Sequence, residues 1–145
     1  MVDRRKHNDG TQLQDAVWRA LQEIQKHHEC FVHRFTDSKA SRNLVGAQPS
    51  DYMAVFGGTP FLLECKSTCV GASIRKLVMG SAGGKRQLAK AKQFIRAGGR
   101  GFFIWHDSLA DTLLVYVAGE WASPLLGARR LADAERVLLE VLEGA

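Results

Sequence analysis

The sequence predicts an α/β domain in which helices cover a mixed central β-sheet. Three observations support this prediction: an amphipathic segment at each end, several short strand-like runs between them, and one helical segment that divides those runs into two groups. The chain has 145 residues, of which 46% are hydrophobic, which suits one continuous core. We therefore treat residues 1–145 as a single domain.

The first element is a helix expected over residues 12–28, with Thr11 as its N-cap. Its apolar side chains recur at the spacing of one helical face: Leu13, Val17, Leu21 and Ile24.

Three short strands are expected next. The first covers residues 31–35 and is followed by a polar loop over 36–48. The other two, 51–56 and 61–66, flank Gly57-Gly58, which is a strong signal for a tight hairpin turn.

Residues 67–84 are rich in glycine and serine, so we expect a mobile loop there that is helical at most in part. A second helix is expected over residues 85–97 and ends at Gly98-Gly99. Two strands and a closing amphipathic helix complete the chain, over residues 101–105, 112–118 and about 131–141. The predicted order is α-β-β-β-α-β-β-α.

Charge is distributed unevenly along the chain. Residues 1–100 carry 17 Lys or Arg against 8 Asp or Glu, whereas residues 101–145 carry 3 against 7. This asymmetry favours a polyanionic partner such as nucleic acid, although ribosomal and membrane-surface proteins share it. No apolar run approaches the length of a membrane span, and the three cysteines lack the paired spacing of a structural zinc site. We expect a cytoplasmic protein with no membrane partner.

The hairpin places two acidic residues opposite each other. If Gly57-Gly58 is a two-residue turn, cross-strand partners have numbers that sum to 115, and Asp51 faces Glu64. Side chains alternate along a strand, so Lys66 shares the face of Glu64. A three-residue turn would shift this register by one residue and separate the pair.

Two like charges at such a position need a positive partner. Lys66 is one candidate, and a divalent cation is the other, because Mg²⁺ binds one or two protein carboxylates together with waters and substrate phosphates. Such an ion polarises a phosphodiester and lowers the pKa of an attacking water. The alternative is an ordinary half-buried hairpin with a Glu64–Lys66 ion pair on its polar face.

The run from Asp51 to Glu64-Cys-Lys66-Ser-Thr resembles the PD-(D/E)xK nuclease signature, and in particular the archaeal-type Holliday junction resolvases. Leu13-Gln14-Asp15-Ala-Val17 resembles the start of the catalytic helix in those enzymes and in phage endonuclease I, and Arg86-Gln87 opens a helix where they often carry a Gln. The similarity extends from about residue 10 to residue 118.

The resemblance implies a restriction-endonuclease-like core and a homodimer that cuts two strands of a four-way DNA junction with Mg²⁺ or Mn²⁺, without a nucleotide cofactor. Transferred by position, Asp51 and Glu64 are metal ligands, Lys66 is the catalytic lysine, and Gln87 is an auxiliary residue of the active site. A nickase or repair nuclease of the same superfamily, or a branched-DNA-binding protein without activity, remains the alternative.

Two positions depart from the family pattern. The usual Pro-Asp becomes Pro49-Ser50-Asp51, and the first-helix Glu becomes Gln14. A glutamine carbonyl binds a hard cation without supplying charge, so Gln14, Asp15 or Glu23 is expected to complete the catalytic site.

Further residues are expected to contact DNA. The alternative for each is an ordinary solvated side chain on the protein surface. Two are serines of the polar loop and six are cations: Ser38, Ser41, Arg4, Arg5, Lys6, Arg42, Lys85 and Arg86.

Overall fold

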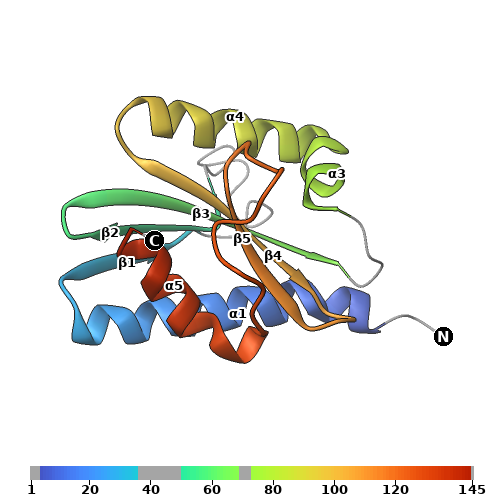
Figure 1. The fold of residues 1–145 in the computed structure, drawn as a ribbon, viewed down its shortest axis with the longest axis horizontal. Coiled ribbons are helices and arrows are strands. Elements are labelled where there is room, and N and C mark those ends of the chain that lie inside the picture. The colour runs from blue at the N-terminus through green and yellow to red at the C-terminus, as the bar shows by residue number, and fades with distance from the viewer. Residues whose placement is uncertain (1–3, 36–49, 69–72, 145) are drawn as a thin grey trace.

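The computed structural model describes residues 4–35, 50–68 and 73–144, with side chains described from residue 11 onward. Its centre is a five-stranded sheet in the order β1-β2-β3-β4-β5 (Figure 1). The strands are β1 (Cys30–Arg34), β2 (Tyr52–Phe56), β3 (Thr59–Thr68), β4 (Arg100–Asp107) and β5 (Thr112–Val117). The β3–β4 pair is parallel and the other three pairs are antiparallel, so the sheet is mixed.

Helices cover both faces of the sheet (Figure 1). One face carries α1 (Arg4–His27) and α5 (Ala134–Leu142), with the short 3-10 helix η1 (Leu131–Asp133) before α5. The other face carries α3 (Ile74–Met79) and α4 (Ala82–Arg96), which form the crossover that a parallel β3–β4 pair requires. The α/β class, the mixed sheet and the predicted order are confirmed, with α3 and η1 as additions.

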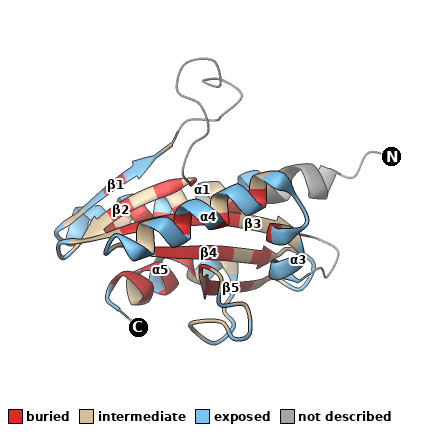
Figure 2. Ribbon diagram, turned by 90° about the horizontal axis from the view of Figure 1, so that it is seen from above, coloured by how far each residue is buried: buried red, intermediate tan, exposed pale blue. Residues whose placement is uncertain are grey.

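Two hydrophobic clusters hold these layers together. The larger lies between the sheet and α1 with α5, where Leu13, Val17 and Leu21 are fully buried against Tyr52 and Leu63. The smaller lies under α3 and α4 and includes these buried residues: Ile74, Val78, Leu88, Ala91, Phe103 and Tyr116. Burial is accordingly concentrated in β3 and β4, whereas the edge strand β1 is largely exposed (Figure 2).

Helix α1 begins earlier than the sequence analysis predicts. It starts at Arg4, so the prediction of Thr11 as N-cap is wrong. A single glycine costs only about 1 kcal/mol inside a helix, so Gly10 does not stop it. No described helix combines the length and the apolar character that crossing a bilayer demands.

The loop expected over residues 67–84 is replaced, in its described part, by ordered elements. Each of its two helices begins at a serine cap: Ser73 Oγ accepts from the Lys76 N–H at 3.2 Å and Ser81 Oγ from the Gly84 N–H at 3.0 Å. A Cβ on Gly84 would lie 2.1 Å from the Val78 carbonyl oxygen. The absence of a side chain there lets α3 pack directly on α4.

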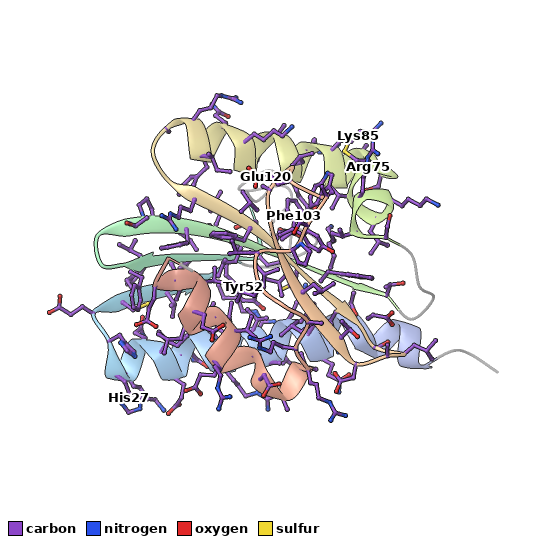
Figure 3. All side chains as sticks on the ribbon, viewed as in Figure 1. His27, Tyr52, Arg75, Lys85, Phe103 and Glu120 are labelled. Carbon is purple, nitrogen blue, oxygen red and sulfur yellow. The ribbon has the colours of Figure 1, made fainter. Side chains whose placement is uncertain are left out.

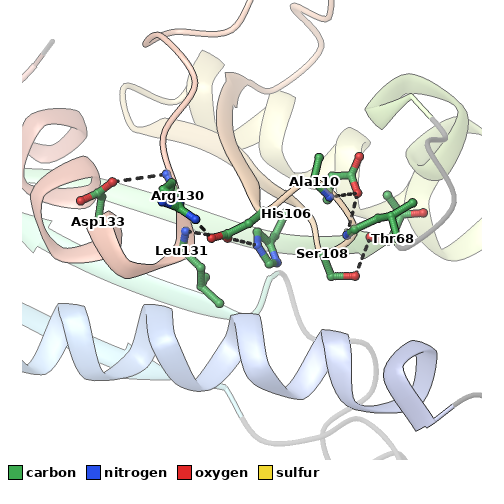
Figure 4. A network of polar contacts seen from close by, with 10 residues as sticks. Thr68, His106, Ser108, Ala110, Arg130, Leu131 and Asp133 are labelled. Carbon is green, nitrogen blue, oxygen red and sulfur yellow. Dashed lines mark hydrogen bonds and ion pairs between the residues drawn. The ribbon is translucent and has the colours of Figure 1, made fainter.

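Asp111 anchors the C-terminal helix to the β4–β5 turn. Figure 4 labels its partners His106, Arg130 and Leu131. The Asp111 carboxylate accepts from Nε2 of the buried His106 at 2.9 Å, from the Leu131 N–H at 3.1 Å and from Arg130 Nε at 3.3 Å. Asp111 is the one described non-glycine residue with a positive φ, 48°. An aspartate tolerates this conformation better than most residues and supplies the acceptor that joins turn, strand and η1.

Replacing Asp111 is expected to destabilise the fold. Asp111→Ala removes three hydrogen bonds and disfavours the positive φ, so unfolding should become easier by about 1–3 kcal/mol. Asp111→Asn keeps an acceptor oxygen and the tolerance of positive φ, so it should lose less. Thermal unfolding measures both, and equal losses for the two variants would contradict the role assigned to the acceptor.

Candidate active site

The candidate site lies where the β2–β3 hairpin opens. Gly57 and Gly58 both have positive φ, 57° and 83°, as a two-residue type I′ turn requires. Phe56 pairs with Thr59, and the ladder runs to its last pair, Tyr52 with Leu63. The predicted register is therefore confirmed, and Asp51 and Glu64 follow at the next position.

Asp51 and Glu64 close the end of this ladder with their side chains. Glu64 Oε2 accepts the Asp51 backbone N–H at 3.0 Å, and Asp51 Oδ2 accepts the Cys65 backbone N–H at 2.8 Å. Each strand thus donates a main-chain N–H to a carboxylate of the other. N–H groups that are shielded from water need partners, so this exchange fixes the position of both carboxylates.

Burial dominates the electrostatics of the pair. Only 5% of Glu64 is exposed, and burial, followed by the charge of Asp51, raises the pKa of its carboxyl. Burial also raises the pKa of Asp51, against the opposing effect of the Cys65 N–H. Two ionised carboxylates are therefore costly here unless a cation compensates them.

Lys66 is the cation that the chain itself supplies. Its Nζ lies 3.8 Å from Glu64 Oε1 and donates to Gln87 Oε1 at 2.7 Å. Gln87 belongs to α4, so this hydrogen bond joins the crossover helix to β3. The ammonium is held beside the acidic pair with 23% of its side chain exposed.

The donor set suits a hard divalent cation. Asp51 and Glu64 are adjacent carboxylates, and Mg²⁺ takes one or two protein carboxylates and keeps waters or phosphate oxygens as its other ligands. Among the described residues, no group of three or more His, Cys, Asp or Glu side chains forms a candidate metal cluster. Within this described part of the chain, Asp51 and Glu64 are the adjacent carboxylates that could hold such an ion.

The three first-helix candidates are placed differently. Gln14 contributes its backbone carbonyl, which accepts from the Tyr52 hydroxyl at 2.6 Å. Asp15 lies 3.5 Å from Arg34 in an ion pair, and Glu23 pairs with Lys26 on the helix surface at 3.1 Å. Glu23 is therefore engaged away from the site, and no described contact links a side chain of the three to Asp51 or Glu64.

Sequence reasoning missed Arg34. It ends β1 opposite Tyr52, and its guanidinium lies 5.9 Å from the centre of that ring. Burial raises the pKa of Asp51, and the charge of Arg34 is the smallest of several effects that oppose this rise. The β1–β2 register would have revealed this position, but no turn signal in the intervening loop predicts that register.

The residues predicted to bind DNA fall into three groups. Lys85 and Arg86 are exposed near the start of α4. Arg4, Arg5 and Lys6 lie in the first turn of α1, but their side chains lie outside the described part of the chain. Ser38, Ser41 and Arg42 lie outside the described residues altogether.

Comparison with known proteins adds no identification. The chain matches no protein-family model, and a search of curated proteins finds no significant match.

The pH dependence of stability tests the burial of Glu64. Because its pKa is raised above the unfolded value of 4.5 to about 9, the stabilising protonated form is lost as pH rises through that window. Glu64→Gln keeps an acceptor oxygen and stays neutral. In chelator it should match the wild type below pH 4.5 and exceed its melting temperature by about 10 °C or more at pH 8 to 9.

Glu23→Gln is the matched control, since Lys26 lowers the pKa of this exposed carboxylate. It should not raise the melting temperature at any pH. If the difference in melting temperature between Glu64→Gln and the wild type does not change with pH, the pKa of Glu64 is not raised.

Proposed function

We propose that this protein is a metal-dependent endodeoxyribonuclease with a restriction-endonuclease-like core, selective for four-way DNA junctions. The observation that carries the proposal is the arrangement of Asp51, Glu64, Lys66 and Gln87 within direct hydrogen-bonding or ion-pairing distance. Asp51 directly precedes β2, Glu64 and Lys66 belong to β3, and Gln87 belongs to α4. These four are the residues that the PD-(D/E)xK resemblance assigns to catalysis.

The residues of the site have distinct roles in phosphodiester hydrolysis. Asp51 and Glu64 would hold Mg²⁺ or Mn²⁺, which polarises the phosphodiester and makes a water molecule a better nucleophile. Lys66 would stabilise negative charge on the phosphate as the bond to the leaving oxygen breaks. Gln87 orients the Lys66 ammonium, and the Cys65 N–H holds Asp51 in place.

The substrate class and the assembly follow from the resemblance and from symmetry. A four-way junction presents two equivalent strands, and a two-fold homodimer places one site on each.

A second candidate is a branched-DNA-binding protein on the same fold that does not cut. Gln14 favours it, because the resembling enzymes carry a glutamate there and a neutral amide leaves the site with less negative charge for a cation. Other nucleases of this fold, such as nickases, share the proposed chemistry and differ in substrate.

Cleavage of a labelled four-way junction, beside a linear duplex of the same sequences, tests the proposal. Wild type with Mg²⁺ should make paired nicks in the junction alone, and chelator or Glu64→Gln should abolish them. Tight junction binding without cutting would favour the second candidate, whereas equal cutting of both substrates would indicate a nuclease without junction selectivity.

Gln87 is a positioning residue, and its replacement should lower the rate of cleavage more than the affinity for DNA. Gln87→Ala removes the 2.7 Å bond that orients Lys66, so the single-turnover rate should fall by about 10- to 100-fold. Gln93→Ala, at an exposed position of the same helix, is the control and should cut at the wild-type rate. Equal rates for the two variants would show that Lys66 does not need this contact.

A further inference from the structure

Helices α3 and α4 contain several lysine and arginine residues and no aspartate or glutamate. No Asp or Glu occurs between Glu64 and Asp107, and every cation of residues 73–100 is exposed. These cations are Arg75, Lys76, Lys85, Arg86, Lys90, Lys92, Arg96 and Arg100.

The cations of α3 have fixed positions relative to those of α4. Ile74 and Val78 bury α3 in the cluster under α4, and Gly84 permits close contact between the two helix backbones. Arg75 and Lys85 consequently project at the same end of the molecule, one from each helix (Figure 3). We call the surface formed by Arg75, Lys76, Lys85, Arg86 and Lys90 the α3–α4 platform.

The α3–α4 platform adjoins the candidate active site. Gln87, which binds Lys66, directly follows Arg86 in α4, and Lys90 lies one helical turn further on. A strand of DNA that reaches Lys66 therefore passes next to these side chains. Lys92 and Arg96 lie further along α4, and Lys92 packs close to Gly119 after β5.

The charges of the platform lack compensation within the described residues. Within the part of the chain that the structure describes, no ion pair involves a cation of α3 or α4, and α4 has no acidic residue in its first turn. Arg86 and Lys90 are four residues apart, where like charges repel, and cations near a helix N-terminus oppose the helix dipole. Such a surface is unfavourable by itself and becomes favourable when a polyanion covers it.

We propose that the α3–α4 platform binds the phosphate backbone of a DNA duplex arm and directs that arm to the Asp51–Glu64–Lys66 site. The inference rests on the proposed function for its ligand. It adds the surface on which the duplex lies. It also assigns DNA binding to α3, a segment that the sequence analysis expected to be a loop. Contacts of this kind do not depend on base sequence and weaken steeply with salt.

The test measures how binding depends on salt, in chelator, so that cleavage plays no part. The platform variant is Arg75→Gln with Lys76→Gln, and the control is Arg96→Gln with Arg100→Gln, which removes the same charge outside the platform, at the end of α4 and the start of β4. Along α4, Arg96 lies about 9 Å beyond Lys90 and about 16 Å beyond Lys85. Fluorescence anisotropy with a labelled duplex and a labelled junction gives the affinities.

Loss of two phosphate contacts should reduce the slope of log affinity against log salt by about 1.8. Between about 50 and 200 mM salt, the wild type should then lose about 12-fold more affinity than the platform variant does. The control should keep most of the wild-type slope. Circular dichroism should show both variants folded, since all four side chains are exposed.

Other outcomes overturn the inference without deciding the proposed function. If the platform variant and the wild type have equal salt slopes and the wild type cuts junctions, the DNA lies on another surface. Equal losses for both variants would indicate only general charge attraction. Binding to vesicles of anionic lipid in preference to DNA would assign the platform to a membrane surface. If the salt slope of the platform variant falls as expected but the wild-type protein does not cut junctions, this inference stands and the proposed nuclease activity is wrong.

Discussion

The exchange of backbone N–H groups between Asp51 and Glu64 is the interaction on which the site depends. At this point the β2–β3 ladder ends, and two buried main-chain donors need acceptors that the opposite strand no longer supplies. The two carboxylates meet this need, and in doing so they are held together in a region where water is scarce. The structural role and the candidate chemical role are therefore served by the same two side chains.

The two faces of the sheet have different roles, one in stability and the other in the candidate site. On the α1 and α5 face, side chains of β3 such as Phe61, Leu63 and Cys65 lie in the main core and contribute stability. On the other face, Glu64 and Lys66 meet α4 through Gln87. Because the parallel β3–β4 pair requires a crossover, a helix must lie over this face, and α3 and α4 bring their cations with it.

Much of the site was predictable because its geometry is local. Gly57-Gly58 predicts a two-residue turn, the turn predicts the register, and the register places Asp51 opposite Glu64 with Lys66 on the same face. Thr11 shows the limit of such signals, since a favourable cap residue lies inside a helix that continues through it. The segment 73–84 shows another limit, because its glycines and serines resemble a loop but serve as helix caps and as a close helix contact.

By itself, the sequence determined the α/β class, the order of the elements, the hairpin register and the acidic pair, because each depends on periodicity or on turn chemistry within a few residues. Only the tertiary structure decided that Gln87 reaches Lys66, that Arg34 lies near Asp51, and that Arg75 and Lys85 belong to one surface. These contacts join elements far apart in the chain. Their geometry depends on how strands pair across loops and how helices pack on a sheet, and no local pattern of residues encodes either one.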